Sequence, residues 1–295
     1  MDRVDAMHVF TRVFERRSFA AAAEDLNLPS STVSDVIKKL ESRIGVVLLE
    51  RTTRQVTPTI DGEAFYQRCL SIIQDVEDAE TFLSGVKPKG ALRVDVHGTL
   101  ARHFLMPTLP AFLQAYPDID LFLSEGDRLS DVVREGIDCV LRVGSVTSED
   151  LVAKQIATLE EVTVASPTYI KKFGVPENYK ALATHKMVGF RATGSSTPMA
   201  LEFCVQGKIQ TVTIETSLTV NSAETLVMAA RYGLGIIQVP RYHIERDIDE
   251  GLLIPLLEDC PPSPSPVSIL YPRNRKYASR VKAFVDWLET AFGQR

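Results

Sequence analysis

The sequence predicts a multidomain chain: an all-α winged helix-turn-helix domain, one long helix, and then an α/β region made of two lobes. Apolar residues at helical spacing, interrupted by one tight turn, fill most of the first 58 residues. A heptad pattern without breaks follows, up to about residue 84. Beyond residue 90, apolar strands alternate with amphipathic helices, which is typical of parallel sheets with crossover connections.

Length and composition limit the class of protein. The 295 residues suit two or three domains, each with its own core. Hydrophobic residues make up 45% and charged residues 24%, as in soluble globular proteins. No segment approaches the ~18 apolar residues of a membrane span, and the N-terminus lacks the basic start and apolar core of a signal peptide. We therefore expect a cytoplasmic protein without a membrane partner.

The net charge of −5 does not by itself indicate a nucleic-acid partner, but the charge is distributed unevenly along the chain. Residues 1–62 hold nine Lys or Arg and nine Asp or Glu, whereas the remainder holds 24 and 29. Any positive surface in the first part must therefore be clustered rather than abundant.

The first two helices are predicted from apolar spacing and from their ends. A first helix carries its apolar residues at helical spacing, at Met7, Phe10, Val13 and Phe14. Ser18 offers an N-cap oxygen to a second helix, Phe19–Leu26. Asn27 can adopt the left-handed conformation that ends a helix, and Pro29 prevents the helix from continuing. The chain therefore turns sharply at this point.

A third helix is predicted to begin near Ser31 and to end near Gly45. One face is apolar, with Val33, Ile37, Leu40 and Ile44. The opposite face is polar, with Ser31, Ser34, Asp35, Lys38 and Ser42. Short polar side chains let the backbone approach base edges in the DNA major groove, although a solvated face of a small helical bundle would look the same.

The next segment favours the DNA-binding interpretation. Val46–Leu49 is an apolar run, Arg51 and Arg54 flank two threonines, and Val56 begins a second short run. We expect a hairpin with basic residues at its tip. Such a wing can place both arginines on phosphates or in the minor groove.

Thr59 is predicted to cap a long helix that runs to about Ser84, where Gly85 and Pro88 end it. An a/d seam follows this helix through Phe65, Cys69, Ile72, Val76, Ala79 and Leu83. The seam could pack on the C-terminal region of the same chain. We expect a dimer contact instead, because symmetric proteins read paired half-sites.

After residue 90 the predicted strands are Leu92–Val96, Ile119–Ser124 and Ile137–Val143. The predicted helices are Arg102–Tyr116, with two prolines in its first turns or at a kink, and Leu129–Glu135. A second set of elements runs from about residue 161 to 266 and includes a helix at Ala223–Tyr232, a strand at Ile236–Val239 and another helix after Pro240. Residues 198–216 show only strand-like alternation. The proline-rich stretch 261–266 forms a stiff connector to a strand at Val267–Tyr271 and a helix at Tyr277–Phe292.

Three stretches of the first 85 residues, SFAAAAEDL, SSTVSDVIKKLESRIGVVLLERTTR and VTPTIDGEAF, resemble LysR-type transcriptional regulators in order and spacing. DRLSDVVREGIDCVLRVG and ASPTYIKKFG resemble the effector domain of the same family, which is itself similar to periplasmic binding proteins. The resemblance implies four parts: a DNA-binding domain (1–58), a linker and dimerisation helix (59–86), lobe 1 (90–162 and 267–295) and lobe 2 (163–266). It implies a regulator of transcription that is controlled by a small molecule between the lobes.

The resemblance places Ser31, Thr32 and Ser34 where the family reaches bases, and both wing arginines where it holds the backbone. The predicted DNA-binding residues are Ser18, Ser30, Ser31, Thr32, Ser34, Asp35, Lys38, Arg51 and Arg54. Many relatives have a basic or amide residue at the position of Asp35. This carboxylate could accept from a cytosine amino group or cap a neighbour.

In open α/β sheets, ligands bind beyond the carboxyl ends of the strands, near helix N-termini. The predicted effector-binding residues are His97, Gly98, Thr99, Arg142, Thr193, Gly194, Ser195, Ser196, Asn221 and Ser222. They suit a small polar or carboxylate-bearing metabolite, although ordinary polar loops and caps would look alike. Arg142 could bind an anion, or it could form a structural ion pair with Asp138 or Asp127.

Two other function classes are less well supported. A hydrolytic enzyme is disfavoured because no GxSxG, HExxH or GxGxxG motif follows a predicted strand, and we expect no catalytic residue, cofactor or metal. The four cysteines, Cys69, Cys139, Cys204 and Cys260, lack CxxC spacing and indicate buried thiols. A thiol-based redox regulator would use Cys204 or Cys260, yet neither has a flanking Lys, Arg or His to lower its pKa.

Overall fold

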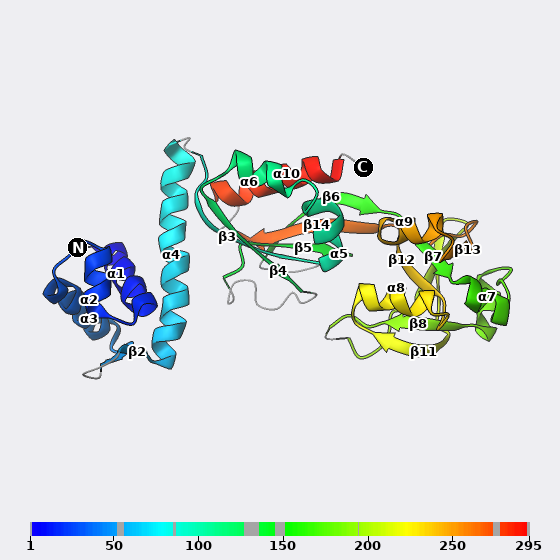
Figure 1. Cartoon of the computed structure of the whole chain (residues 1–295), viewed down its shortest axis with the longest axis horizontal. Coiled ribbons are helices and arrows are strands. Elements are labelled where there is room, and N and C mark those ends of the chain that lie inside the picture. The colour runs from blue at the N-terminus through cyan, green and yellow to red at the C-terminus, as the bar shows by residue number, and fades with distance from the viewer. Residues whose placement is uncertain are drawn as a thin grey trace.

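The computed structural model of the chain describes residues 2–51, 56–84, 87–126, 136–144, 151–193, 195–273 and 278–293. For residues 51 and 81–84 only the backbone is described. Four parts follow one another along the longest axis: a head (residues 2–58), the long helix α4 (Ile60–Ser84), lobe 1 and lobe 2 (Figure 1). None of the helices in these ranges is long and apolar enough to span a membrane.

The head contains three helices and a two-stranded hairpin: α1 (Arg3–Arg16), α2 (Phe19–Asp25), α3 (Ser30–Ile44), β1 (Leu49–Arg51) and β2 (Val56–Pro58). Their apolar faces form one core, which includes Phe10, Val33 and Ile37. The predicted turn is confirmed in detail. The Ser18 hydroxyl accepts the amide of Ala21 at 3.3 Å, and Asn27 is left-handed with φ 51°.

The first strand of the hairpin begins later than the apolar run Val46–Leu49 predicts. Val46 and Val47 are exposed, and β1 begins only at Leu49. The carboxylate of Glu41 accepts the amides of Leu48 and Leu49, at 2.9 and 3.1 Å. A side chain of α3 thus satisfies the backbone where the strand was expected to begin.

Helix α4 begins as predicted, because the hydroxyl of Thr59 accepts the amide of Gly62 at 2.9 Å. Its first half completes the core of the head, with Phe65, Cys69 and Ile73 packed there. Gly62 is required at this crossing, because a Cβ at this position would lie 2.0 Å from the carbonyl oxygen of Leu48.

Lobe 1 is built on a five-stranded sheet in the order β4-β3-β5-β14-β6. Its strands are β3 (Gly90–Val96), β4 (Ile119–Glu125), β5 (Cys139–Val143), β6 (Leu151–Leu159) and β14 (Ser265–Pro272). The first three are parallel, and β14 runs antiparallel to both β5 and β6. Strand β6 has no counterpart among the predicted elements. Helix α10 (Ser279–Gly293) packs on this sheet and supplies Phe284 and Leu288 to its core.

The predicted helix Arg102–Tyr116 is broken into pieces. The short helix α5 (Gly98–Leu100) leads into a π-helical turn at Ala101–Leu105, and α6 (Leu109–Ala115) starts afresh. Pro107 has no amide hydrogen, so the π-helical turn cannot continue through it as a regular helix. Pro110 lies in the first turn of α6, where an amide hydrogen is not needed. The predicted helix Leu129–Glu135 lies outside the described residues.

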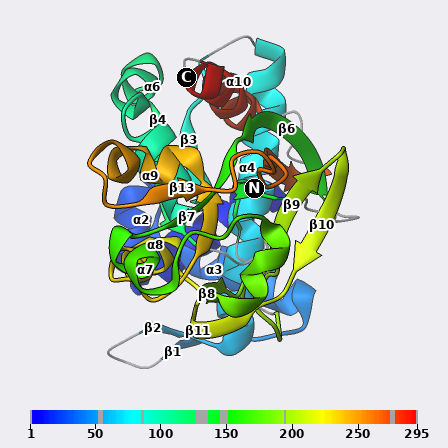
Figure 2. The ribbon, with the colours of Figure 1, turned by 90° about the vertical axis from the view of Figure 1, so that its right-hand side faces the viewer.

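Lobe 2 holds three small sheets. Strand β7 (Glu161–Ala165) pairs antiparallel with β12 (Ile237–Pro240) and β13 (Ile254–Leu256). Strand β8 (Lys186–Phe190) pairs in parallel with β11 (Glu215–Val220). The stretch with strand-like alternation is the hairpin β9–β10 (Leu201–Val205 and Lys208–Val212), which stands at one side of the lobe (Figure 2).

Helices cover the sheets of lobe 2: α7 (Pro167–Phe173), a 3-10 helix (Tyr179–Thr184), α8 (Ala223–Arg231) and α9 (Arg241–Asp249). The predicted helices at Ala223–Tyr232 and after Pro240 are confirmed. The chain passes between the lobes twice, from β6 to β7 at Glu160 and from lobe 2 back into β14 near Pro264. These two crossings place the first turns of α8 and α9 against lobe 1 (Figure 1).

Candidate nucleic-acid interface and ligand cleft

Helix α3 presents the two faces that its sequence predicts. Val33, Ile37 and Leu40 are buried in the head. The opposite face is polar, with Ser30, Ser31, Asp35 and Lys38 exposed and Thr32 and Ser34 half-buried. Pro29 at the N-cap of α3 has no side chain that could accept from the first turn, and helix amides of this kind can bind water or an anion such as a phosphate. The exposed face can therefore approach a duplex end-on through its N-terminal half.

The other predicted DNA-binding residues have different settings. Ser18 is half-buried, and its hydroxyl is engaged as the cap of α2. Strands β1 and β2 pair from Leu49 opposite Pro58 to Arg51 opposite Val56. The side chain of Arg51 and the whole of Arg54 lie outside the described residues. A role for either arginine stays a prediction.

The predicted seam of α4 is divided between two environments. Phe65 lies against α1, with its ring centroid 5.3 Å from that of Phe10, and Cys69 is fully buried. The later seam residues are uncovered in the described chain: Ile72 and Val76 are 39% and 37% exposed, and Ala79 is exposed as well. The side chain of Leu83 lies outside the described residues. The first part of the seam thus packs in the core of the head of its own chain. In the described chain, Ile72, Val76 and Ala79 form an exposed apolar stripe.

One group of predicted effector residues lies at the carboxyl end of β3 and touches lobe 2. The hydroxyl of Thr99 lies 2.8 Å from Nδ1 of His97 and 2.7 Å from the hydroxyl of Tyr242 in α9. Thr99 is buried, whereas His97 and Gly98 are half-buried. Burial raises the pKa of Tyr242 to about 12, so its hydroxyl stays protonated; either this hydroxyl or that of Thr99 can donate in their contact.

A second group lies at the carboxyl ends of β8 and β11. These parallel strands are paired up to Phe190 and Val220, and the amide of Arg191 donates to the carbonyl of Val220 at 2.8 Å. The loops that follow are therefore neighbours, and their described polar residues are exposed: Thr193, Ser195, Ser196, Asn221 and Ser222. Ser195 donates to the carbonyl of Thr197 at 2.8 Å, and Ser222 caps α8. Gly194 lies outside the described residues.

Arg142 occupies a different setting from the one predicted. Its buried guanidinium forms an ion pair with Asp95 of β3, and Asp95 also accepts from Ser124 at 2.6 Å. The predicted partner Asp138 pairs with Arg280 instead, and Asp127 lies outside the described residues. Arg142 thus takes part in a structural ion pair, and its described partner is Asp95, which lies beside it on the neighbouring parallel strand.

Sequence reasoning missed the residues that join the lobes. Arg102, in the π-helical turn, donates to Glu224 of α8 at 2.8 Å and to Glu125 at the end of β4 at 3.3 Å. His243 of α9 lies 3.5 Å from the same carboxylate of Glu224. Burial lowers the pKa of His243, although Glu224 acts against this shift. No local pattern marks these residues, because each gains its role only from the packing of the lobes.

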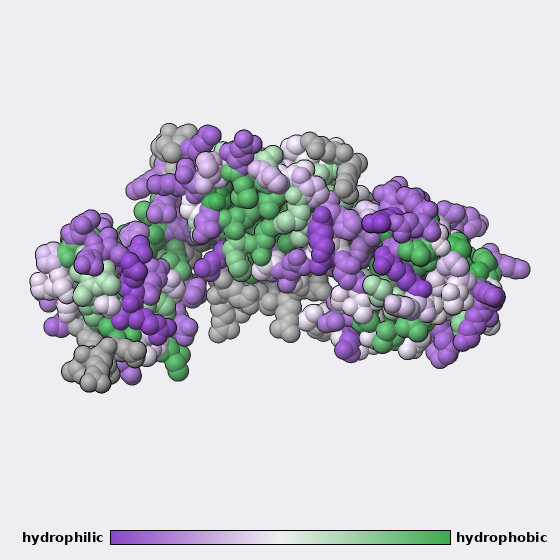
Figure 3. All heavy atoms as spheres, viewed as in Figure 1, coloured by the Kyte–Doolittle hydropathy of each residue, from purple (hydrophilic) through white to green (hydrophobic). Residues whose placement is uncertain are grey.

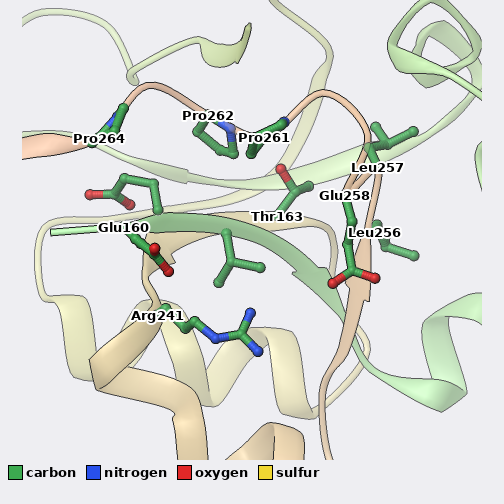
Figure 4. A pocket seen from close by; sticks show the side chains of 11 residues that line it. Glu160, Thr163, Arg241, Leu256, Leu257, Glu258, Pro261, Pro262 and Pro264 are labelled. Carbon is green, nitrogen blue, oxygen red and sulfur yellow. The ribbon is translucent and has the colours of Figure 1, made fainter.

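A separate pocket of about 320 Å³ lies beside the two crossings (Figure 4). It is lined by residues of β7, α9 and the proline-rich connector, among them Glu160, Thr163, Arg241 and Pro262. None of the predicted effector residues that the structure describes lines it. Glu161 also lines this pocket, and burial raises the pKa of its carboxyl to about 7.

Comparisons with known proteins agree with this arrangement. Residues 4–63 match the family model of the bacterial regulatory helix-turn-helix protein, lysR family, and residues 86–293 match that of the LysR substrate binding domain. The chain is 34% identical to the uncharacterized HTH-type transcriptional regulator YhjC of Escherichia coli over 98% of this chain and 97% of that protein. It is 32% identical to the HTH-type transcriptional regulator CrgA of Neisseria meningitidis over 98% and 97% of the two chains.

Solved structures give the same result. The structure of CrgA, a LysR-type transcriptional regulator from Neisseria meningitidis, matches with a TM-score of 0.61 and 31% identity, and covers 99% of this chain and all of that one. Full-length AphB from Vibrio cholerae, at 23% identity and a TM-score of 0.59 over 97% and 98% of the two chains, shares the fold. The chain therefore belongs to the LysR family of helix-turn-helix transcriptional regulators.

Proposed function

We propose that this regulator binds a double-stranded DNA operator through α3 and the β1–β2 wing, and that a small polar or carboxylate-bearing metabolite between the lobes controls this binding. We further propose that it acts in the cytoplasm as a homodimer or homotetramer, without an enzymatic step. The observation that carries the proposal is the contact of Thr99 in lobe 1 with Tyr242 in lobe 2, at 2.7 Å.

This contact supports a ligand site because it lies where the fold gathers polar groups from both lobes. The loop after β3 brings His97 and Thr99, and α9 brings Tyr242. The exposed loops after β8 and β11 add hydroxyls and backbone donors on the side of lobe 2. A small ligand with several hydrogen-bond acceptors could replace the direct contact between the lobes with contacts of its own.

The two lobes supply a way for a ligand to act at a distance. A ligand shifts an equilibrium only by its different affinity for the two states. Here the states would differ in how lobe 2 sits on lobe 1, and therefore in the contacts of Arg102 with Glu224 and of Thr99 with Tyr242. In an oligomer, such a change would alter the spacing of two heads on DNA.

An oligomer is supported by the apolar stripe of α4. Ile72, Val76 and Ala79 continue the seam that buries Phe65 and Cys69 in the head. A second copy could cover the stripe by two-fold symmetry, which would also pair the two heads. Figure 3 shows a further apolar patch on lobe 1. The exposed large apolar residues of lobe 1 include Leu113 and Phe122.

The test begins with DNA. Fluorescence anisotropy with the DNA upstream of its own gene should show specific binding that weakens as salt is added, because phosphate contacts release counterions. Binding to that DNA no tighter than to a scrambled duplex would contradict the operator proposal.

The ligand is tested separately, with a panel of small carboxylates and amino acids in a thermal-shift assay. A ligand at 100 times its Kd stabilises the folded state by roughly 2.7 kcal/mol. The shift should be lost in Thr99→Val, which keeps the size of the side chain but removes its hydroxyl. A ligand whose shift survives both Thr99→Val and Ser222→Ala binds somewhere other than the proposed cleft.

The thiol-based alternative receives less support. Cys260 is buried, and burial together with Asp259 raises its pKa, which disfavours the reactive thiolate. Burial also raises the pKa of Cys69 to about 12 and that of Cys139 well above its ordinary value. Only Cys204 is partly exposed among the four thiols.

A further inference from the structure

Arg280 is the largest of the fully buried side chains in the described part of the chain, and it is charged. It lies in the first turns of α10 with 1% of its surface exposed. Its guanidinium donates to Asp78 of α4 at 2.5 Å and to Asp138, just before β5, at 3.2 Å. One side chain thus joins the C-terminal helix, the central sheet of lobe 1 and the linker helix.

The lobe 1 side of this junction is held firmly. A carboxylate oxygen of Asp138 accepts the amide of Arg93 at 2.9 Å, and the amide of Asp138 donates to the carbonyl of Arg93 at 2.8 Å. Asp138 is therefore fixed to β3 before it meets Arg280. Hydrogen bonds of this kind set the direction of the ion pair as well as its strength.

The head and lobe 1 hold opposite faces of α4. Phe65, Cys69 and Ile73 follow one another at intervals of four residues and are packed in the head. Gln74 and Asp78 are also four residues apart and face lobe 1, where Gln74 donates to the carbonyl of Ala91 at 2.6 Å. At about 100° per residue these two sets lie on opposite sides of the helix, as Figure 1 shows for the head and lobe 1.

The two attachments are also close together along α4. Ile73 and Asp78 are separated by only about 7.5 Å of helix, less than two turns. A short segment of a continuous helix does not bend easily, because its backbone hydrogen bonds would have to break. What fixes the head relative to lobe 1 is therefore the contact of α4 with lobe 1, and not the helix itself.

A buried ion pair is a costly way to hold two elements together. Removing charges from water costs several kcal/mol per ion, and well-packed apolar residues can often replace such a pair without loss of stability. An apolar contact, however, tolerates sliding and rotation far better than an arginine shared between two carboxylates. The use of Arg280 at this point favours a role in fixing geometry.

The geometry points to Arg280 as a positioning residue that locks the linker helix onto lobe 1 and so sets the direction in which the DNA-binding head is presented. The head, α4 and lobe 1 then move as one body, and the change caused by an effector falls on lobe 2. This last consequence rests on the proposed function, but the lock itself can be tested without any effector.

The test measures the distance between the head and lobe 1 by pulsed electron paramagnetic resonance. Nitroxide labels are placed at Glu24→Cys in α2 and Gln114→Cys in α6, two exposed positions, in a Cys204→Ser background. The labelled chain is mixed with an excess of unlabelled chain, so that distances between subunits do not contribute. The labelled protein with Asp78 and Arg280 unchanged should give one narrow distance distribution.

Three variants weaken the contact between α4 and lobe 1, one from Asp78 and two from Arg280. Asp78→Asn removes only the carboxylate of α4 and leaves Arg280 bonded to Asp138, so that lobe 1 keeps its own ion pair. Arg280→Met removes the cation altogether, and Arg280→Lys retains the charge but cannot reach both carboxylates with a planar fork. The distribution should at least double in width in Asp78→Asn and Arg280→Met, with a smaller change in Arg280→Lys.

The matched control is Asp247→Asn in lobe 2, which breaks the ion pair of a buried aspartate with Arg231, away from α4. It should lower the unfolding midpoint without changing the distance distribution. A distribution in Asp78→Asn as narrow as in the parent, or one broadened equally by Asp247→Asn, would overturn the inference. Failure of the effector proposal alone would leave these distances unchanged, so that the two outcomes are distinguishable.

Discussion

Arg102 and Glu224 are 122 residues apart in sequence, and their side chains meet at 2.8 Å across the junction of the two lobes. Arg102 belongs to the π-helical turn after β3, and Glu224 lies in the first turn of α8. Glu125 and His243 lie around the same contact, so that two carboxylates share one guanidinium beside a buried imidazole. Lobe 2 is therefore held on lobe 1 by a contact that is partly open to solvent, which is suited to being broken and remade.

Arg102→Ala should loosen the junction without unfolding either lobe. Both side chains of the pair are about half exposed, and pairs of this kind contribute at most about 1 kcal/mol to stability. We expect faster hydrogen exchange in the first turns of α8 and α9, with little change in the unfolding midpoint. Lys186→Ala removes a similarly exposed ion pair, with Glu215, inside lobe 2 and serves as the control. Unchanged exchange in Arg102→Ala would show that other contacts hold the lobes.

The sequence predicts the head well because its structure is specified locally. Ser18 and Thr59 act on amides three residues away, and the left-handed residue Asn27 ends its own helix. Such interactions need no knowledge of the rest of the fold. The same holds for the apolar faces of α3 and of the first half of α4.

The residues that join distant parts could not be predicted in this way. Arg280 meets Asp78 across 202 residues, and Arg142 takes Asp95 rather than the nearer Asp138. In each case the partner is chosen by the order of strands in the sheet and by the docking of helices on it. The loops of the candidate cleft were located because the carboxyl ends of parallel strands share one edge, but Tyr242 was missed because it reaches that edge from α9 of lobe 2.

Glu161 should make the stability of the protein depend on pH near neutrality. It begins β7 at one crossing, and burial raises the pKa of its carboxyl to about 7, with Glu202 adding to the shift and a hydrogen bond from Ser265 opposing it. The folded state therefore holds a proton that the unfolded state releases near pH 4.5. The contribution of Glu161 to stability is full below about pH 4.5 and falls as pH rises toward 7.

Glu161→Gln should remove this dependence. The shift from 4.5 to about 7 corresponds to at most about 3 kcal/mol. In urea unfolding, the free energy of unfolding of the variant should rise relative to that of the wild type between about pH 5 and about pH 8. Burial lowers the pKa values of His185 and His243, so their contribution to the stability of the protein is lost as pH falls. This opposite trend is the same in both proteins and cancels when their free energies of unfolding are subtracted. Glu160→Gln, which changes the exposed neighbouring residue, is the control and should keep the pH dependence of the wild type. A difference in free energy of unfolding between wild type and Glu161→Gln that does not change with pH would contradict the prediction.

Native thiol reactivity should be confined to one cysteine. Cys69, Cys139 and Cys260 are buried, and the pKa of each is raised by that burial. Ellman's reagent should therefore react rapidly with a single thiol per folded chain, and Cys204→Ser should abolish that phase. All four thiols should react once urea is added. A fast phase that persists in Cys204→Ser would show that a buried cysteine is exposed by a local opening and would revive the thiol-based alternative.

Asp35 and Lys38 should have separate roles in DNA binding. Both are exposed on the polar face of α3, one turn apart. If Lys38 holds a phosphate, Lys38→Ala weakens binding to all duplexes alike and lowers the slope of log affinity against log salt by about 1. If Asp35 accepts from a cytosine amino group, Asp35→Ala leaves the salt slope unchanged and relaxes discrimination at one base pair by about 1–3 kcal/mol.

Anisotropy titrations against an operator and a set of its single-base variants, each at several salt concentrations, separate the two effects. Arg43→Ala is the control, since Arg43 is exposed in the last turn of α3 but away from the face that carries Asp35 and Lys38. It should change neither the slope of log affinity against log salt nor the discrimination between bases. An Asp35→Ala variant that binds every duplex more tightly, with no change in preference, would assign Asp35 to repulsion of the phosphates and not to base recognition, because removing a carboxylate near the backbone helps all sequences equally.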